Sequence, residues 1–143
     1  MVKLISKQRY KNDCGPVAII NTIRKLGCPF SYKGTKDLFK FFGYSPEYGM
    51  KTSNLKRCLR FFGVKYKQYH NPKIQVIKES IRNGNFGIIL YCDKDSGHFT
   101  VVTREYKKDF KAYNSMLDGS DLLSKSDLSY YRKNHYITYI EIL

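Results

Sequence analysis

The chain has 143 residues, and its 26 Lys and Arg against 12 Asp and Glu give a formal net charge of +14. This length fits one domain of ordinary size, and the longest apolar runs, such as residues 86–91, are far too short to cross a bilayer. Membrane insertion is therefore excluded, and residues 1–6 form no secretory segment, so we expect a cytoplasmic protein. The charge permits nonspecific nucleic-acid contact, although the basic residues are scattered along the whole chain.

The first half of the chain predicts helices. The first helix begins after Asp13, which can cap its amino terminus, and ends at Gly27. Its apolar residues recur at helical spacing, at Val17, Ile20, Ile23 and Leu26. Three more helices are expected over residues 36–42, 53–62 and 73–82, each followed by a glycine or an Asn-Gly pair. Residues 44–51 are predicted to form a loop between the second and third helices.

β-branched and aromatic residues become frequent in the second half. They predict strands over residues 86–91, 98–106, 110–113 and 136–140. The turn at residues 107–109 indicates an antiparallel hairpin, and residues 126–133 suit one short helix. Helices followed by strands are typical of an α+β domain. We therefore expect N-terminal helices packed on one side of a C-terminal antiparallel sheet.

The four cysteines are widely spaced and form no C-x-x-C pair, so neither a zinc ribbon nor a dithiol redox site is indicated. They are Cys14, Cys28, Cys58 and Cys92. Free thiols are their expected state. The three histidines are far apart, and no cysteine or carboxylate accompanies them at ligand spacing. We therefore expect no metal site and no cofactor.

One cysteine, Cys14, lies on the first turn of the best-defined helix. Unpaired N–H groups at a helix amino terminus carry partial positive charge and stabilise a thiolate, the form that attacks carbonyls. Cys14 is therefore the candidate nucleophile, and Gly15 leaves the approach to its sulfur open. Asp13 would raise the thiol pKa if its carboxylate faced the sulfur, but its capping role is expected to turn it away. The alternative is that Cys14 is a small buried apolar residue.

His98 is the candidate general base, because it stands at the head of the strongest strand pattern and follows a small Ser-Gly pair. The strand can hold its ring rigidly while the preceding loop leaves room beside it. The alternative is an edge histidine with a structural role. His70 lies in a turn and His135 lies among cationic residues, so both are expected on the surface.

A cysteine and histidine pair needs a third group that fixes the imidazole tautomer. Asn114 ends the strand that the hairpin places beside the strand of His98, so the two side chains can meet at one end of the sheet. The alternative is that Asn114 simply starts a turn. Asp118 and Asp109 are further candidates for the orienting group, although Asp109 belongs to the far end of the hairpin.

Acyl transfer also needs hydrogen-bond donors for the developing oxyanion. The backbone N–H of Cys14 can supply one. The side-chain amide of Gln8, which lies just upstream in the same loop, is the candidate for the other.

These residues, in this order, resemble the peptidase domain of the exporters that cut double-glycine leaders from bacteriocin and quorum-peptide precursors, a papain-like cysteine peptidase family. Gln8 and the DCG at residues 13–15 match the family's amino-terminal motif, and HFTVV at residues 98–102 matches its H-[FY]-x-V-V motif. Residues 48–64, YGMKTSNLKRCLRFFGV, are similar to the family's helix that ends in Phe-Gly. Asn114 stands where the family usually has Asp.

The resemblance implies that residues 1–143 form a single papain-like peptidase domain. It makes Cys14 the nucleophile, His98 the base, Asn114 the orienter and Gln8 the oxyanion donor. Papain itself has Asn as its orienter, although a neutral group stabilises an imidazolium less than a carboxylate does. The sequence has no membrane span and no P-loop motif GxxxxGK[ST], so we expect a free-standing domain.

The sequence thus predicts a thiol protease that hydrolyses a peptide or isopeptide bond in a peptide or protein substrate through an acyl-enzyme on Cys14. The alternative is a catalytically silent basic binding module for an acidic protein or nucleic acid, which the net charge and the 13 tyrosines support. Acyl transfer or deamidation by the same residues also stays open, because an amine can replace water at the acyl-enzyme.

Overall fold

The computed structural model describes residues 3–8, 11–31, 35–92, 97–114 and 121–143. Its helices are α1 (Cys14–Lys25), α2 (Lys36–Phe41), α3 (Thr52–Phe61), α4 (Ile74–Arg82) and α5 (Lys125–Asn134). Its strands are β1 (Tyr66–His70), β2 (Phe86–Cys92), β3 (Gly97–Tyr106), β4 (Asp109–Tyr113), β5 (Leu122–Ser124) and β6 (Tyr136–Ile142). Within this part of the chain, no helix has both the length and the apolar character needed to cross a membrane.

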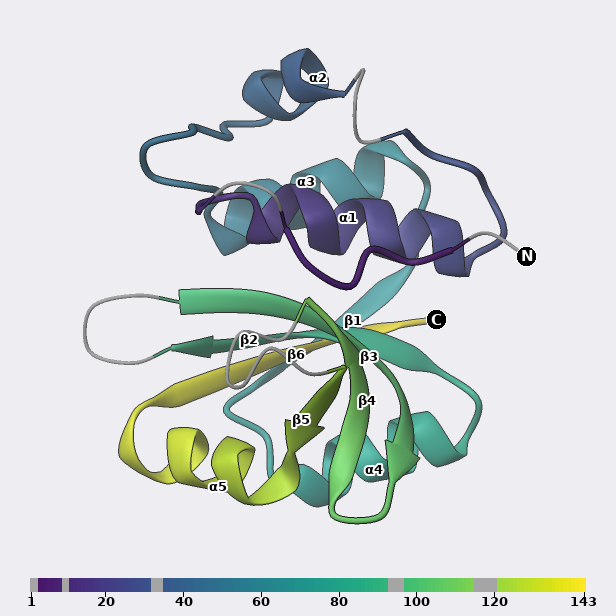
Figure 1. The fold of residues 1–143 in the computed structure, drawn as a ribbon, viewed down its shortest axis with the longest axis vertical. Helices are drawn as coiled ribbons and strands as arrows, with labels where there is room; N and C mark the ends of the chain where they lie inside the picture. The colour runs from purple at the N-terminus through teal and green to yellow at the C-terminus, as the bar shows by residue number, and fades with distance from the viewer. Residues whose placement is uncertain (1–2, 9–10, 32–34, 93–96, 115–120) are drawn as a thin grey trace.

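The strands form an antiparallel sheet in the order β1-β6-β2-β3-β4-β5 (Figure 1). β3 lies between β2 and β4, in the interior of the sheet. On one side, Tyr91 of β2 pairs with His98 near the start of β3. On the other side, β3 and β4 form the expected hairpin, in which Val101 pairs with Tyr113. The start of β3 and the end of β4 therefore lie at the same end of the sheet.

Helices cover both faces of the sheet: α1, α2 and α3 lie on one face, and α4 and α5 lie on the other (Figure 1). Successive residues of a strand point to opposite faces. Ile88 and Val101 accordingly belong to the core beneath α1, whereas Ile89 and Val102 belong to the core against α4 and α5. Burial on both faces explains why these strands have continuous apolar sequences. The α+β class is confirmed, but the expectation of helices on one side alone is wrong for α4 and α5.

The predicted helices and strands agree with the structure to within two residues at each end, but the sequence does not predict the edge strands β1 and β5. β1 has the sequence YKQYH, is only partly buried and pairs with β6. β5 has 3 residues and pairs with β4. Edge strands of natural proteins are commonly short or polar. Neither segment therefore carries the apolar run by which a strand is recognised.

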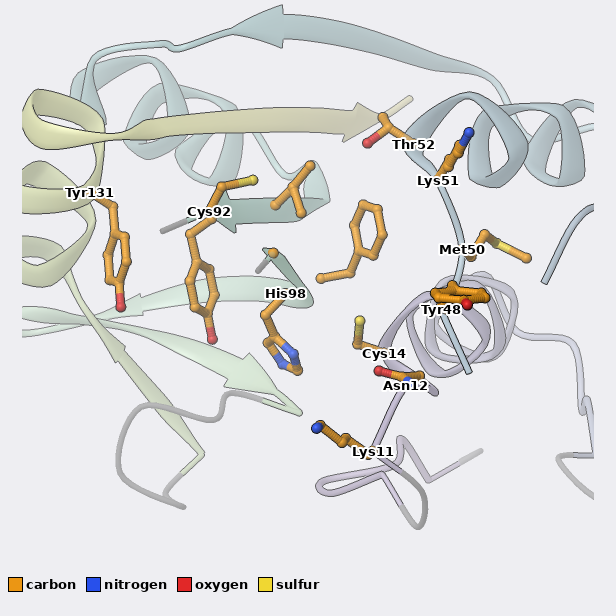
Figure 2. A pocket seen from close by; sticks show the side chains of 15 residues that line it. Lys11, Asn12, Cys14, Tyr48, Met50, Lys51, Thr52, Cys92, His98 and Tyr131 are labelled. Atoms are coloured by element: carbon orange, nitrogen blue, oxygen red, sulfur yellow. The ribbon is translucent and has the colours of Figure 1, made fainter. Parts of the chain in front are cut away.

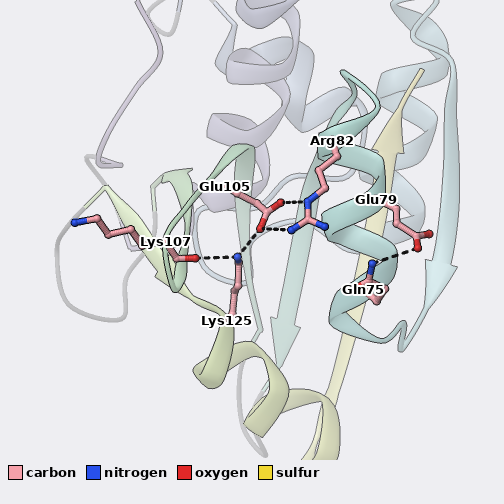
Figure 3. A network of polar contacts seen from close by, with 6 residues as sticks. All are labelled: Gln75, Glu79, Arg82, Glu105, Lys107 and Lys125. Atoms are coloured by element: carbon pink, nitrogen blue, oxygen red, sulfur yellow. Dashed lines mark hydrogen bonds and ion pairs between the residues drawn. The ribbon is translucent and has the colours of Figure 1, made fainter.

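The two ends of β3 have different surroundings. Its start lines a pocket (Figure 2), and its far end carries an ion-pair network that reaches α4 and α5 (Figure 3). Glu105 accepts hydrogen bonds from Arg82 of α4, with Nη2 at 3.2 Å, and from Lys125 of α5, with Nζ at 2.6 Å. The hydrogen bonds from Arg82 and Lys125 lower the pKa of Glu105 from its ordinary 4.5 to about 2. This network fastens both helices of that face to β3.

Glu105→Gln should lower the free energy of unfolding by about 1 kcal/mol at neutral pH, a modest loss because the side chain of Arg82 is more than half exposed. Because folding lowers the pKa of Glu105, its contribution is fully present above pH 4.5 and is lost as the pH falls through about 2. Urea unfolding across this range measures the difference. Glu79→Gln, at an exposed position of α4, is the matched control. A difference that persists at the lowest pH would show that packing, not charge, is responsible.

Candidate active site

Cys14 is the first residue of α1, which is itself part of the core. Residues 15–23 of this helix are all buried, because the helix packs against β3 and α3. The helix begins where the sequence predicts it. The thiol is therefore positioned by an element that cannot shift without unpacking the core.

Asp13 precedes α1 but does not cap it. Its side chain receives no hydrogen bond from the backbone N–H groups that begin the helix. The carboxylate instead accepts a hydrogen bond from the hydroxyl of Tyr44, and both residues are buried. Burial and this carboxylate raise the pKa of Tyr44 well above its ordinary value. The hydroxyl therefore stays protonated and acts as the donor of the hydrogen bond. The predicted cap is wrong, and the pair instead ties the start of α1 to the segment after α2.

The backbone N–H groups of Phe99, Gly15 and Cys14 itself lie close enough to the sulfur of Cys14 to lower the pKa of its thiol. Burial nevertheless raises the pKa of the thiol above its ordinary 9.0; the N–H groups oppose this rise, and the Asp13 carboxylate adds to it. The expected stabilisation by the helix terminus is therefore present but is outweighed by desolvation. A thiol that is protonated at neutral pH is the result.

His98 is held between two neighbouring strands. It pairs with Tyr91 across β2 and β3, and the centroids of the two rings lie 5.5 Å apart at a tilt of 58°. Its Nε2 contacts the backbone carbonyl oxygen of Asn114. Burial lowers the pKa of His98 below its ordinary 6.5, and this hydrogen bond partly opposes the shift. The imidazole is therefore neutral at neutral pH and is able to accept a proton.

Cys14 and His98 line the same pocket, which has a volume of about 650 Å³ (Figure 2). Apolar and aromatic side chains form much of its wall: Tyr48, Met50, Leu90, Tyr91, Phe99 and Tyr131. Lys11 and Lys51 also line it, and among the described lining residues none is acidic. The pocket thus places a thiol and an imidazole, from α1 and β3 respectively, before one space that a substrate can enter.

Asn114 lies beside His98, as the hairpin predicts, but the imidazole contacts its backbone carbonyl. Its side chain pairs with Gln8. Asn114 Oδ1 accepts from the backbone N–H of Gln8 at 2.8 Å, and Asn114 Nδ2 donates to Gln8 Oε1 at 2.8 Å. The side-chain nitrogen of Gln8 donates to the carbonyl of Lys11 at 2.7 Å. The structure therefore brings Gln8, His98 and Asn114 together through contacts that sequence reasoning does not specify.

The loop between α2 and α3 forms the wall of the pocket on the side of Cys14 away from His98 (Figure 2). The side chain of Asn12 holds this loop by donating to the carbonyl oxygens of Pro46, at 2.8 Å, and Glu47, at 2.7 Å. Asn12 and the wall residue Tyr48 were missed as site residues, because the sequence indicates only that this segment is a loop. The positive φ of Gly49, 80°, marks its turn.

Gly15 is required for packing against the pocket wall. A Cβ atom at Gly15 would lie 2.9 Å from the Cβ of Met50, which is buried beside it. This clash is with the rigid base of a side chain and cannot be relieved by a rotamer change. This contact with the pocket wall is a reason for glycine at position 15 that the sequence does not indicate, and the open approach to the thiol stays a prediction.

The remaining candidates lie elsewhere. His70 and His135 are exposed, as expected. Asp109 pairs with Tyr106 at the far end of the β3–β4 hairpin, and Asp118 lies outside the described residues. Within the described part of the chain, no group of three His, Cys, Asp or Glu residues is placed to hold a metal ion. None of the four cysteines forms a disulfide bond.

A cysteine at the start of a helix, packed on an antiparallel sheet that supplies a histidine to the same pocket, is the arrangement of papain-like thiol peptidases. The crystal structure of the peptidase domain of Streptococcus ComA, described as a bifunctional ABC transporter involved in a quorum sensing pathway, shares the fold. The two superpose with a TM-score of 0.69 over 99% of this chain and 98% of that chain, at 13% sequence identity. The fold is therefore that of a papain-like cysteine peptidase domain.

A comparison with curated proteins gave no match. The profile of the Peptidase C39 family matches residues 3–138, nearly the whole chain. The chain belongs to this family of cysteine peptidases.

Cys14 should react with iodoacetamide slowly at neutral pH and faster as the pH rises past 9.0, because burial raises its pKa above that value. The ultraviolet absorbance of a thiolate should be absent at neutral pH. Cys14→Ser supplies the baseline for both measurements, and Cys28→Ser removes the exposed thiol. A thiolate absorbance at neutral pH that Cys14→Ser abolishes would contradict this expectation and would show that Cys14 and His98 form an ion pair at rest.

Proposed function

We propose that this protein hydrolyses peptide or isopeptide bonds, with Cys14 as the nucleophile and His98 as the general base, and that residues 1–143 act as one peptidase domain. One observation carries the proposal. The residue that begins α1 and the residue near the start of β3 line one pocket, and the backbone N–H of Phe99, the next residue of β3, lowers the pKa of the Cys14 thiol. Nucleophile and base are therefore held by two packed elements of the core.

The reaction begins with both groups neutral. Burial lowers the pKa of His98 and raises that of Cys14, so the thiol proton passes to the imidazole as the sulfur attacks the substrate carbonyl. A bond forms between sulfur and carbonyl carbon, and negative charge develops on the carbonyl oxygen. The backbone N–H of Cys14 and the side-chain amide of Gln8 are the proposed donors for that oxygen.

His98 then donates its proton to the leaving amine, the carbon–nitrogen bond breaks, and an acyl-enzyme remains on Cys14. Water that gives a proton to His98 attacks the thioester and restores the thiol. Asn114 is the proposed third member of the triad, because its contact with the ring of His98 fixes the imidazole through these steps. An amine in place of water would give acyl transfer from the same intermediate.

The proposed substrate is a precursor peptide whose leader ends in two glycines. This follows from the resemblance of the motifs around Cys14 and His98 to the double-glycine-leader peptidases. The ComA peptidase domain, by its description, belongs to a transporter in a quorum sensing pathway. The shared fold supports a peptide substrate here.

Cys14→Ala should lower kcat/KM on a quenched peptide library by about a thousandfold or more, because the group that forms the acyl-enzyme is gone. Cys28→Ser should retain full activity, since Cys28 is exposed beyond the end of α1. A peptidyl chloromethyl ketone should add once, at Cys14, as read by mass spectrometry.

Labelling at Cys28, Cys58 or Cys92 that persists in Cys14→Ala would refute the assignment. Nucleic-acid binding that weakens steeply with salt, is unaffected by Cys14→Ala and occurs without any peptide cleavage would favour the basic binding module instead.

Gln8→Glu should lower kcat by about a hundredfold with little change in KM, because it loses the N–H donors of the amide. It keeps a side-chain oxygen that accepts from Asn114 Nδ2. Gln68→Glu, a change of the same kind on the edge strand β1, is the control for the added charge. Thermal unfolding confirms that each variant is folded. An unchanged kcat in Gln8→Glu would remove Gln8 from the oxyanion site.

A further inference from the structure

We propose that Asn114 positions two catalytic groups at once. Its backbone carbonyl fixes the imidazole of His98, and its side chain holds Gln8 through two hydrogen bonds. This inference rests on the proposed function. It differs from the triad expected from the sequence, in which the side chain at position 114 orients the ring. Asn114 is thus a positioning residue that couples the general base to the proposed oxyanion donor.

The backbone conformation of Asn114 accounts for the use of its carbonyl. Asn114 has a φ of 69°, in the left-handed region, where Asn is among the most favoured residues after glycine. β4 ends one residue earlier, at Tyr113, so the left-handed residue turns the chain away from the ladder of β3 and β4. The Asn114 carbonyl, released from the ladder, meets His98 Nε2.

This contact determines the tautomer of the ring. A carbonyl oxygen only accepts hydrogen bonds, so His98 Nε2 must carry a proton in order to donate to it. In the neutral imidazole Nδ1 is then the unprotonated nitrogen, the one that takes the proton of the Cys14 thiol. The backbone of Asn114 therefore performs the task that a carboxylate or amide side chain performs in other triads.

The side chain of Asn114 has a different partner. It makes two reciprocal hydrogen bonds with Gln8, each 2.8 Å long, to the backbone N–H and to Oε1. The backbone N–H of Asn114 also donates to the carbonyl of Ser6 at 3.0 Å. Asn114 is 2% exposed, so these bonds are formed away from solvent, where they strongly fix geometry. The amino-terminal segment that carries Gln8 is therefore docked on the end of β4.

The amide at position 114 suits this partner better than a carboxylate does. Asn114 uses its oxygen to accept from the Gln8 backbone and its nitrogen to donate to Gln8 Oε1. Aspartate has no donor for Oε1, and its second oxygen would face another acceptor. The amide of Asn114 therefore matches both groups that Gln8 presents to it.

The test uses Asn114→Gly, Gln8→Ala and the double variant in the full chain. Glycine adopts the left-handed conformation readily and keeps the carbonyl, so this variant removes only the side chain. Nitrogen-15 NMR of histidine-labelled protein reports the tautomer of His98, with His70→Gln and His135→Gln used to assign its signal. Steady-state kinetics reports kcat and KM separately.

We expect His98 to keep the Nε2–H tautomer in Asn114→Gly. We expect kcat to fall by about ten- to a hundredfold with KM little changed, because Gln8 loses its support. The double variant should be no slower than Gln8→Ala alone, since both changes act through Gln8. Loss of the Nε2–H tautomer in Asn114→Gly, or a double variant slowed by the product of the two single effects, would overturn the proposal.

Asn114→Asp is the second variant, for use if the glycine variant is unfolded. It should retain the Nε2–H tautomer and lose kcat as Asn114→Gly does, because Asp cannot donate to Gln8 Oε1. Full or increased activity would show that the side chain orients the ring and would overturn the proposal. The NMR measurement needs no turnover, so it decides the role of the carbonyl even where Cys14→Ala shows that the proposed peptidase activity is absent.

Discussion

The packing of α1 against the start of β3 is the contact on which the site depends. It brings the backbone N–H of Phe99 near enough to lower the pKa of the Cys14 thiol, and it brings His98, the preceding residue, into the same pocket. Both elements are buried on the face of the sheet that α1 covers. β4 then follows β3 through the hairpin and delivers Asn114 to the same end of the sheet. The arrangement of reactive groups is thus a consequence of how the core packs.

Desolvation sets the charge state of this arrangement. The sulfur has three backbone N–H groups around it, yet burial still raises the pKa of Cys14, and burial lowers that of His98. The Asp13 carboxylate beside the thiol adds to the first shift, and it also accepts a hydrogen bond from the hydroxyl of Tyr44. At neutral pH the proton therefore lies on the sulfur of Cys14 and the imidazole of His98 is uncharged.

Much of the fold can be predicted from the sequence because it depends on local patterns. Helical spacing and apolar runs locate α1 and the interior strands, and motif position selects Cys14 and His98. The edge strands β1 and β5 lack such patterns, because each lies at an edge of the sheet and pairs with one strand only. The hairpin predicts the place of Asn114, but only its φ of 69° decides that the carbonyl meets the ring. The contact of Gly15 with Met50 joins segments distant in sequence and leaves no local trace.

The two sides of the pocket, the start of α1 and the loop between α2 and α3, differ in how deeply they are buried. The helix that carries Cys14 is buried over residues 15–23, so moving it would expose core. The facing loop carries Tyr48, which is 88% exposed, and hydrogen bonds from Asn12 hold it in place. Tyr48 itself contributes little to the core, whereas Met50, two residues further on, is buried against Gly15 and anchors the loop. We expect differences in substrate bulk to be taken up on the side of Tyr48, away from the start of α1. If Cys14 and His98 act as proposed, substitutions in this loop would change which substrates fit while the start of α1 stays in place.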